Sequence, residues 1–407
     1  MLSADQLDVI KQTVPVLREH GETLTRHFYQ RMFRENPEVK VFFNPAHQQA
    51  GTQQRALAAA ICAYAENIQN PAVLAGAVEL IAQKHASLGI RAEHYPVVGN
   101  NLLASIREVL GEAATPAIID AWAAAYGVLA DIFIQREAEI YRQQEGFHGW
   151  QGFKRFVVTR REPASRNIVS LYLKPEDGQP LQPHQPGQYI TLRVTLSSGE
   201  AVMRNYSLSN RPGAEQYRIS VKRETAPQEG VPHGLCSGYL HEQLKEGDVV
   251  ELAPPCGEFV LKDKPATPLP LVLIAGGVGI TPIISMLYAA LEEQPGRDII
   301  FIQCALDGAV RPFADELDTL QRDCDRLKLH VRLSEPSAAD RTSGRHHSEG
   351  FLDAALLADL LGEQRAEFYV CGPAPMLQHT YRLLKARGVD DADIHYEFFG
   401  PAGNLAA

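Results

Sequence analysis

The spacing of hydrophobic residues changes twice along the chain. In roughly the first 145 residues, apolar side chains recur every three to four positions, as at Leu24 and Phe28, and this period predicts amphipathic helices. Between residues 153 and 262 the pattern alternates in short runs separated by Pro and Gly, which is typical of an antiparallel β-barrel. From Pro268 onward, apolar strand segments alternate with helical segments, as in a doubly wound parallel sheet. The pattern therefore predicts an all-α domain, a β-barrel and an α/β domain, in that order.

Glycine-rich residues 144–152 separate the helical pattern from the alternating one. We therefore expect four segments, namely a helical domain at 1–145, a linker at 146–152, the barrel at 153–264 and the α/β domain at 265–407. Within the helical block, Ser3 and Gln6 have the spacing of a capping box, and prolines suit the first turns of three later helices. Helical patterns after the first corner are expected at 51–68, 71–85, 96–110 and 116–143.

Composition and charge exclude several classes of function. The 407 residues carry a formal net charge of −10 and show no basic cluster, which argues against nucleic-acid binding. The first residues lack a cationic segment followed by an apolar one, and no run of about 18 apolar residues is apparent, so neither a signal peptide nor a membrane span is expected. The six cysteines are scattered without a CxxC pair, as in a cytoplasmic protein with reduced thiols. A cysteine-bound cluster is therefore not expected as a redox centre.

The stretch Val202–Ser209, in the middle of the chain, combines a cation, an aromatic ring and a hydroxyl. A flavin dinucleotide needs these three groups: Arg204 for the pyrophosphate, Tyr206 to stack on the isoalloxazine and Ser207 to hydrogen-bond near N5. On these residues alone, an ordinary alternating strand is an equal alternative.

Two later motifs favour the flavin interpretation. An apolar strand runs into Gly276-Gly-Val-Gly-Ile-Thr-Pro282, where glycine lets the backbone approach a dinucleotide pyrophosphate at a helix start. A later strand ends at Cys371-Gly-Pro373 and faces the same crevice. Arg-x-Tyr-Ser, Gly-x-Gly-x-x-Pro and Cys-Gly-Pro, in this order, resemble the ferredoxin-reductase superfamily over roughly residues 152–401.

This resemblance implies FAD and NAD(P) as cofactors. Flavin contacts are implied for Tyr189, Arg204, Asn205, Tyr206 and Ser207, with Gly187 and the helix start Gly234–Ser237 beside them. Nucleotide contacts are implied for Gly276, Gly277, Val278, Gly279, Ile280, Thr281, Cys371 and Gly372. The tail Phe398, Phe399, Gly400 and Pro401 is expected to return to the flavin and cover it, and a final edge strand in this stretch is compatible with that role.

Candidate chemistry in the helical block centres on His85. With Val78 and Ile81 it lies on the apolar face of its helix, where a lone histidine is more often a core residue than a ligand. Gln53 and Leu57 share a face of another helix. Two helices that close a flat cavity, one with histidine and one with glutamine, suit a haem with one protein ligand.

The helical block resembles a globin along its full length, with Phe43 in the corner where a haem-stacking phenylalanine is expected. Across the whole chain the resemblance is to the flavohemoglobins, bacterial and fungal fusions of a globin with a reductase. The stretches that carry it are Leu24-Thr-x-x-Phe-Tyr-x-Arg-Met-Phe33, Ile81-Ala-Gln-Lys-His85, Tyr126-Gly-Val-Leu-Ala130, Arg136-Glu-Ala-Glu-Ile-Tyr141 and Tyr396-Glu-x-Phe-Gly-Pro401.

The flavohemoglobin pattern implies a role for each candidate in the helical block. His85 becomes the proximal ligand of the haem iron, and Tyr95 and Glu137 become the pair that orients and charges it. Tyr29 becomes the distal phenol. The remaining implied positions are Gln53, Leu57 and Phe43 around the haem and Lys84 near the flavin–haem contact. A carboxylate on the histidine Nδ1 makes the imidazole a stronger donor. Two alternatives stay open: Tyr29 as a core aromatic, and Glu137 as an exposed carboxylate on a charged helix face.

The resemblance implies a nitric oxide dioxygenase, in which NO and O₂ become nitrate. FAD would take hydride from NADH or NADPH and pass single electrons to haem b. The expected partners are these small molecules, in a cytoplasmic monomer. Two other functions remain, namely a gas or redox sensor kept reduced by its own reductase, and a reductase whose helical block is a haem-free docking module. Asp307, just past the second strand of the nucleotide domain, mildly favours NADH.

Overall fold

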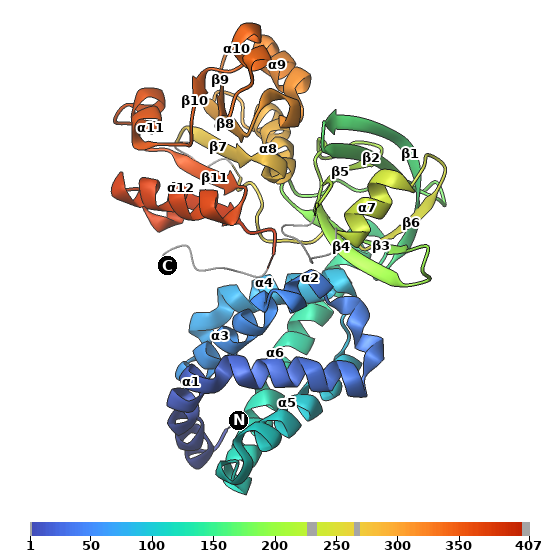
Figure 1. Cartoon of the computed structure of the whole chain (residues 1–407), viewed down its shortest axis with the longest axis vertical. Helices are drawn as coiled ribbons and strands as arrows, with labels where there is room; N and C mark the ends of the chain where they lie inside the picture. The colour runs from blue at the N-terminus through green and yellow to red at the C-terminus, as the bar shows by residue number, and fades with distance from the viewer. Residues whose placement is uncertain (1, 226–233, 264–268, 401–407) are drawn as a thin grey trace. The chain divides into compact units, whose positions relative to one another are not determined.

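The computed structural model describes residues 2–225, 234–263 and 269–400. The chain divides into two compact units. The first runs to Lys154 and also takes in Arg193–Arg204, and the second comprises Arg155–Leu192 and continues from Asn205. The helical block belongs to the first unit, and most of the barrel and the whole α/β domain belong to the second (Figure 1).

The helical block is built from helices that pack around one apolar core. Ser3 caps the first helix as predicted, because its Oγ accepts from the Gln6 backbone while the Gln6 side chain accepts from the Ser3 backbone. Ile10, Phe28 and Met32 from this helix are all almost fully buried. The α-helices are α1 (Ala4–Glu35), α2 (Pro45–Gln49), α3 (Thr52–Glu66), α4 (Ala75–Leu88), α5 (Tyr95–Leu110) and α6 (Pro116–His148), with short 3₁₀ turns at Pro37–Phe42, Pro71–Leu74, Ala92–His94 and Gly111–Ala113.

Helix α6 is longer than predicted. It tolerates Gly146 in its interior and ends only at Gly149, whose φ of 82° is the left-handed conformation that stops a helix, so residues 144–148 of the expected junction are helical. Contrary to expectation, α6 is also long and apolar enough to cross a membrane, by length and composition only. Its Trp122 and Phe133 are buried in the core of this unit, so its apolar character contributes to packing here.

The barrel is a six-stranded sheet in the order β4-β3-β6-β1-β2-β5. An isolated antiparallel bridge between Leu208, just after β4, and Ile219 of β5 joins the two ends of this order, which confirms the predicted barrel. Strand β6 was not expected from the alternation. The elements are β1 (Lys154–Ser165), β2 (Ile168–Pro175), β3 (Tyr189–Thr195), β4 (Ala201–Ser207), β5 (Tyr217–Lys222), α7 (Leu235–Glu242) and β6 (Val249–Leu252).

The α/β domain is the predicted doubly wound sheet, with parallel strands in the order β10-β9-β8-β7-β11-β12. Alternate residues of β7 point to opposite faces: Leu273 packs with α8 and α9, whereas Ile274 packs with α11 and α12, so helices cover both sides (Figure 1). The elements are β7 (Leu271–Gly276), α8 (Ile280–Glu293), β8 (Ile299–Ala305), α9 (Ala314–Asp323), β9 (Leu327–Leu333), α10 (Ala338–Ser343), β10 (Ser348–Glu349), α11 (Ala354–Leu361), β11 (Glu367–Cys371), α12 (Ala374–Ala386) and β12 (Ile394–Glu397), with 3₁₀ turns at Gly277–Gly279, Gly308–Val310 and Asp391–Asp393.

A buried ion pair lies at the start of β11 in this sheet. The guanidinium of Arg297, which is 1% exposed, donates to Glu367 at 2.5 Å and to the Leu269 carbonyl at 2.7 Å. His395 of β12 contacts the other carboxylate oxygen of Glu367 at 3.1 Å. Buried charges need partners of this kind, because desolvation otherwise costs several kcal/mol.

Candidate functional site

Two groups from other helices hold the Nδ1 atom of His85, which lies on α4. This atom is 2.8 Å from Glu137 Oε1 on α6 and 3.2 Å from the hydroxyl of Tyr95, the first residue of α5. The Tyr95 hydroxyl also donates to the same carboxylate oxygen at 2.6 Å. Because an ionised carboxylate only accepts hydrogen bonds, the imidazole proton lies on Nδ1 and Nε2 keeps its lone pair. The structure thus brings together the three residues predicted for the proximal side.

Glu137 points inward because of its position on α6. It lies on one buried stripe of this helix with Phe133 and Tyr141, at helical spacing. Arg136 and Glu139 pair with each other at 2.9 Å and are clearly more exposed. The alternative in which Glu137 belongs to the charged outer face is therefore wrong. A buried carboxylate is costly unless it accepts hydrogen bonds, and the imidazole and phenol supply them.

The hydroxyl of Tyr95 remains a neutral donor. Burial, followed by the hydrogen bond to the Glu137 carboxylate, raises the pKa of Tyr95 far above its ordinary value of 10. The Tyr126 hydroxyl donates to the Tyr95 carbonyl at 2.7 Å and so holds the start of α5 in place. Gly99, one turn later, has no room for a Cβ, which would lie 2.6 Å from the Tyr126 ring.

The donor set around His85 fits a haem. Within the described ranges, no residue hydrogen-bonds to Nε2 of His85, and its side chain keeps 33% of its exposure although it lies on the apolar helix face. No group of three or more His, Cys, Asp or Glu that could hold a metal ion occurs in the same part of the chain. A single imidazole is sufficient for iron only when a macrocycle supplies the other ligands, as in haem proteins.

Tyr29 of α1 and Gln53 of α3 meet in the helical block. The Tyr29 side chain is 5% exposed, and its hydroxyl hydrogen-bonds to the Gln53 side chain. Its ring contacts Phe43 edge-on, at 5.6 Å between ring centroids, and Phe33 at 5.8 Å. Burial raises the pKa of Tyr29 well above 10, so the phenol keeps its proton. Tyr29 is therefore both a core aromatic and a hydroxyl paired with the predicted glutamine.

The two remaining candidates of the helical block differ in exposure. Leu57 is half-buried and packs against the core cluster that includes Tyr29, one turn after Gln53 on α3. Lys84 is exposed on α4, next to His85 in sequence. Its expected place near a flavin stays a prediction.

The strand predicted for the flavin is β4. Arg204 donates to the Met203 carbonyl at 2.6 Å and to Asn44 Oδ1 at 3.0 Å, and it is half-buried. Tyr206, two residues on, lies on the same side of the strand by alternation, with its hydroxyl 3.6 Å from Cys236 Sγ. Ser207 is buried. The fold keeps the cation and the ring on one face, as a bound dinucleotide needs.

The neighbours of this strand are fixed by packing and hydrogen bonds. Asn205 accepts from Thr191 Oγ1 at 2.9 Å, and the Tyr189 ring lies against Gly257, where a Cβ would be 3.0 Å from it. At the start of α7, Ser237 Oγ donates to the Gly234 carbonyl at 3.1 Å and accepts from the Glu224 backbone. The serine hydroxyl thus closes the first turn of the helix.

The glycines after β7 have two different functions. A Cβ on Gly276 would lie 2.3 Å from Met376 Sδ on α12, and one on Gly279 would lie 2.4 Å from the Cys371 carbonyl at the end of β11, so both glycines allow close packing against these elements. Only Gly277 has a left-handed φ, of 54°, and faces open space. Gly276 and Gly279 are thus required by packing, and the pyrophosphate contacts expected for the three glycines stay a prediction.

The loops that follow β7 and β11 meet where the strand order reverses. β7 and β11 are adjacent and parallel, and the chain leaves them in opposite directions across the sheet, which is where doubly wound sheets bind ligands. A Cβ on Gly372 would lie 3.2 Å from the Gly276 backbone. The residues after β7 are packed in as well: Val278 accepts from Thr281 Oγ1 at 3.1 Å, and Ile280 is fully buried.

Cys371 is fully buried at the end of β11. Burial raises the pKa of its thiol well above the ordinary value of 9, and nearby Glu397 acts in the same direction. The residue is therefore a neutral thiol and not a nucleophile.

The described part of the tail follows β12. Phe398 is partly buried against the core cluster that includes Leu377 and Leu384 of α12, whereas Phe399 is 49% exposed, and Gly400 follows with a φ of 157°. Pro401 lies outside the described residues. The edge strand of the sequence prediction is present as β12, and the return of the tail to the flavin stays a prediction.

Residues that the sequence patterns did not reveal join the barrel to the α/β domain. Arg218 of β5 is 6% exposed and makes two 3.0 Å bonds to the Glu316 carboxylate on α9. His184 Nε2 lies 3.0 Å from Ser285 Oγ on α8, and that hydroxyl donates to the Asn210 carbonyl at 3.0 Å. The partners in the first two contacts are 98 and 101 positions apart in sequence, and those in the third are 75 apart. No local sequence pattern marks any of them.

Gly187 belongs to the same junction. Its φ is +106°, and a Cβ there would lie 2.1 Å from the Phe259 carbonyl and 2.5 Å from the Met286 side chain on α8. The sequence interpretation placed Gly187 along the flavin. The structure shows a packing function for it, since only glycine lets the chain before β3 come this close to its neighbours, and its place along the flavin stays a prediction.

Comparisons with known proteins agree with a helical domain followed by a barrel and an α/β domain. Residues 26–133 match the globin family, residues 155–261 an oxidoreductase FAD-binding domain and residues 273–382 an oxidoreductase NAD-binding domain. The class is thus a globin joined to an FAD- and NAD-dependent oxidoreductase. A flavohemoprotein of Rhodopirellula baltica is 47% identical over the full length of both chains, and one of Bacillus subtilis is 42% identical over 100% of this chain and 99% of its own. The chain belongs to the flavohemoprotein family.

Solved structures match the whole chain or its FAD- and NAD-binding part. A flavohemoglobin of Malassezia yamatoensis, with bound FAD and haem, matches 98% of this chain and 100% of its own with a TM-score of 0.85 and 27% identity. The FAD/NAD-binding domain of a nitric oxide dioxygenase from Vibrio cholerae matches 60% of this chain and 97% of its own, with a TM-score of 0.54 and 34% identity.

Proposed function

We propose that this chain is a nitric oxide dioxygenase that uses electrons from NADH or NADPH. Two NO and two O₂ with one NAD(P)H yield two nitrates, NAD(P)⁺ and one proton. When bound, FAD accepts a hydride and releases single electrons, and the haem iron binds a gas and receives those electrons. Membership of the flavohemoprotein family supports this function, as does the likeness of the reductase half to that of the Vibrio cholerae nitric oxide dioxygenase. We further propose that the protein is a cytoplasmic monomer, in keeping with six cysteines that form no disulfide.

One observation carries the proposal, namely the buried carboxylate on His85 Nδ1. We assign His85 Nε2 as the haem ligand, with Glu137 as the acceptor that fixes the ring and Tyr95 as the donor that holds the carboxylate. The 2.8 and 2.6 Å hydrogen bonds set the tautomer and the ring orientation. An imidazole that donates to an anion is a better electron donor and favours the oxidised metal. This suits a centre that is oxidised and re-reduced in every cycle better than one that only carries oxygen.

On the distal side, we assign Tyr29 and Gln53 to the gas ligand. The phenol keeps its proton, and its hydrogen bond to Gln53 holds the hydroxyl in place. A preorganised donor in a water-poor pocket stabilises the negative charge that develops on a polarised ligand. Leu57 and Phe43 supply apolar walls that exclude water.

In the reductase half, we assign Arg204 to the flavin pyrophosphate, Tyr206 to the isoalloxazine face and Ser207 to its polar edge. Gly277 opens the backbone of the β7 loop toward the NAD(P) pyrophosphate at the start of α8, where helix amides attract anions. The buried thiol of Cys371 borders the same crevice without ionising.

The experiment is a visible spectrum of the purified protein during anaerobic NADH addition, followed by NO consumption in air. We expect flavin and haem bands, reduction of both, and NADH-dependent loss of NO with formation of nitrate. A haem-free protein would make the helical block a docking module, and haem reduction without nitrate formation would favour a sensor. His85→Ala should lose the haem spectrum and keep NADH–ferricyanide reduction. A normal haem band and normal NO consumption in this variant would exclude His85 as the ligand.

A further inference from the structure

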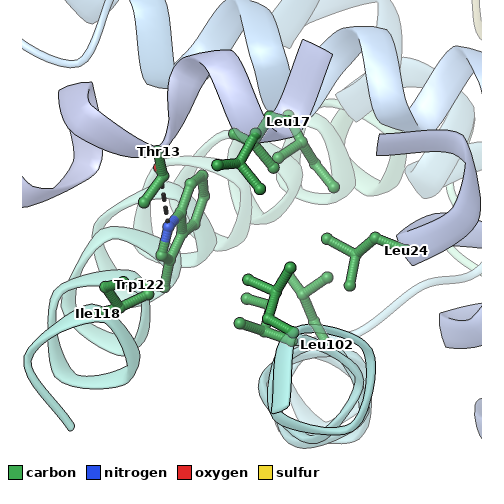
Figure 2. A pocket seen from close by; sticks show the side chains of 10 residues that line it. Thr13, Leu17, Leu24, Leu102, Ile118 and Trp122 are labelled. Carbon is green, nitrogen blue, oxygen red and sulfur yellow. Dashed lines mark hydrogen bonds between the residues drawn. The ribbon is translucent and has the colours of Figure 1, made fainter. Parts of the chain in front are cut away.

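Hydrogen-bonded polar groups inside the helical block end in different ways. In one group, the Trp122 indole donates to the Thr13 hydroxyl at 3.3 Å beside a small apolar cavity (Figure 2). The Thr13 hydroxyl donates in turn to the Ile10 carbonyl at 2.6 Å, so this group ends on backbone and only joins two helices. Another group consists of three glutamine side chains and ends at the hydroxyl of Tyr29, which we assign to the gas ligand.

The orientation of the Gln54 side chain, on α3, is set by a backbone carbonyl. Gln54 is 5% exposed, and its Nε2 atom donates to the Gln48 carbonyl at 3.1 Å and to Gln48 Oε1 at 2.8 Å. A carbonyl oxygen only accepts hydrogen bonds, so the amide nitrogen of Gln54 has to face Gln48. The Gln54 backbone carbonyl accepts from the Thr25 hydroxyl at 2.9 Å, which fixes this part of α3 against α1.

Gln48, on α2, passes this orientation to Gln53. Because Gln48 Oε1 accepts from Gln54, the Gln48 amide nitrogen is the end that donates onward, and it lies 2.9 Å from Gln53 Oε1. With its oxygen toward Gln48, the Gln53 amide turns its nitrogen to the Tyr29 hydroxyl. Burial raises the pKa of Tyr29, and the hydrogen bond with Gln53 lowers it in part, as a donor to the phenolic oxygen does.

The direction of this last hydrogen bond decides what the Tyr29 proton does. A hydroxyl has one proton to donate and two lone pairs that accept. Since the phenolic oxygen accepts from Gln53, its proton stays available for a second partner. A Gln53 amide turned the other way would present its oxygen and take this proton for itself. The same pair of residues thus either frees the phenol as a donor or occupies it.

We propose that Gln48 is a positioning residue of the distal site, which holds the Gln53 amide in the orientation that leaves the Tyr29 proton to the gas ligand. The inference rests on the proposed function for the assignment of Tyr29 to the gas, and on the chain of hydrogen bonds for the role of Gln48. Hydrogen bonds in a chain polarise one another, so the same arrangement also makes Tyr29 a stronger donor.

Gln48→Glu in the full chain, with haem and FAD bound, tests the direction of the chain. A carboxylate only accepts, so it still receives the Gln54 amide but forces the Gln53 amide to turn its nitrogen toward position 48. Tyr29 then donates to Gln53, and the gas loses its hydrogen bond. We expect the O₂ dissociation rate to rise about tenfold in stopped-flow measurements. The infrared stretching band of carbon monoxide bound to the ferrous protein should shift in the same direction as in Tyr29→Phe.

Three further variants separate this effect from charge and from loss of structure. Gln49→Glu places the same charge at the next, exposed position of α2 and should leave both measurements unchanged. Gln48→Met keeps the length of the side chain without hydrogen bonds, so the Gln53 amide is free to turn either way, and the rate should rise about two- to fivefold. In a Gln53→Leu background, Gln48→Glu should cause no further change, because it acts only through Gln53.

Wild-type O₂ dissociation in Gln48→Glu and Gln48→Met overturns the proposal, and Gln48→Met alone decides if Gln48→Glu does not retain haem. Equal increases in Gln48→Glu and Gln49→Glu, or an undiminished effect without Gln53, overturn it as well. If the rates change as expected but no nitrate forms from NO, the role of Gln48 stands and the proposed dioxygenase function fails. If nitrate forms and the Gln48 variants release O₂ as the wild type does, only the role of Gln48 fails.

Discussion

Replacing Glu137 with Gln tests the proximal assignment directly. The amide has nearly the same shape, so its Oε1 can still accept from His85 Nδ1 and from the Tyr95 hydroxyl, now at 2.8 and 2.6 Å. Hydrogen bonds to a charged group contribute about 1.5–3 kcal/mol, and those between neutral groups about 0.5–1.5 kcal/mol. The variant therefore loses roughly 1–1.5 kcal/mol in the bond to the imidazole.

This loss acts mainly on the oxidised haem, because the carboxylate offsets the extra positive charge of the ferric state. For a one-electron couple, a tenfold change in equilibrium, about 1.4 kcal/mol, corresponds to about 59 mV. The midpoint potential of the haem should accordingly rise by roughly 45–65 mV in Glu137→Gln. Spectroelectrochemical titration of the full protein, followed at the haem bands, measures this shift.

Two further variants sharpen the result. Glu139→Gln, on the same helix, removes an exposed charge that pairs with Arg136 and should leave the potential nearly unchanged. Tyr95→Phe removes the donor that competes for the Glu137 carboxylate, so the potential should fall. An unchanged potential in Glu137→Gln with full haem content would refute the reasoning. Equal shifts in Glu137→Gln and Glu139→Gln would show a general charge effect without a specific hydrogen bond.

Three other predictions concern separate parts of the molecule. Tyr29→Phe should raise the O₂ dissociation rate about ten- to a hundredfold, because it loses a hydrogen bond worth roughly 1.5–3 kcal/mol, and should barely change the carbon monoxide dissociation rate in stopped-flow measurements. Parallel increases in both rates would mean that Tyr29 has a packing role only. Arg204→Ala should weaken FAD binding about tenfold or more in fluorescence titrations, whereas Arg160→Ala, at an exposed position, should not, and equal losses would indicate instability. Burial tends to raise the pKa of Glu367, but hydrogen bonds from His395 and Arg297 prevail and lower it from 4.5 to about 2. The stabilisation from this lowered pKa is present above pH 4.5 and is lost as the pH falls toward 2. The free energy of unfolding of the nucleotide domain in urea should therefore fall by about 3 kcal/mol over this range in the wild type and by much less in Glu367→Gln. An equal pH dependence in the two proteins would exclude the carboxylate as its source.

The fold could be predicted from the spacing of hydrophobic residues, because each domain has its own simple and repeated spacing. The 3.6-residue period of the helical block, the alternation of the barrel and the apolar runs of β7, β8 and β11 each leave only one arrangement that buries the apolar side chains. The end of α6 was misplaced because glycine at position 146 resembles a boundary in sequence. Inside a helix, glycine costs only about 1 kcal/mol, which packing can offset.

The family resemblance implied the proximal residues and their pairing, but the residue pattern by itself did not select Glu137 over its neighbours. Arg136, Glu137 and Glu139 look alike as a charged segment, and only the stripe from Phe133 to Tyr141 selects the one that turns inward. The junction between barrel and α/β domain was invisible for a different reason. Long-range pairs such as Arg218 with Glu316 depend on where two domains meet, and nothing near either residue in sequence encodes it.

The burial of Cys371 has a consequence for the durability of the protein. Nitrosating and oxidising agents that arise from NO in air attack thiolates much faster than thiols. Burial raises the pKa of Cys304 to about 12 and, with the help of Glu66, also raises that of Cys62. These three sulfurs therefore stay protonated near neutral pH. Thiol modification by products of its own substrate NO is therefore slowed at these three cysteines. Packing provides this protection while the cysteines are retained.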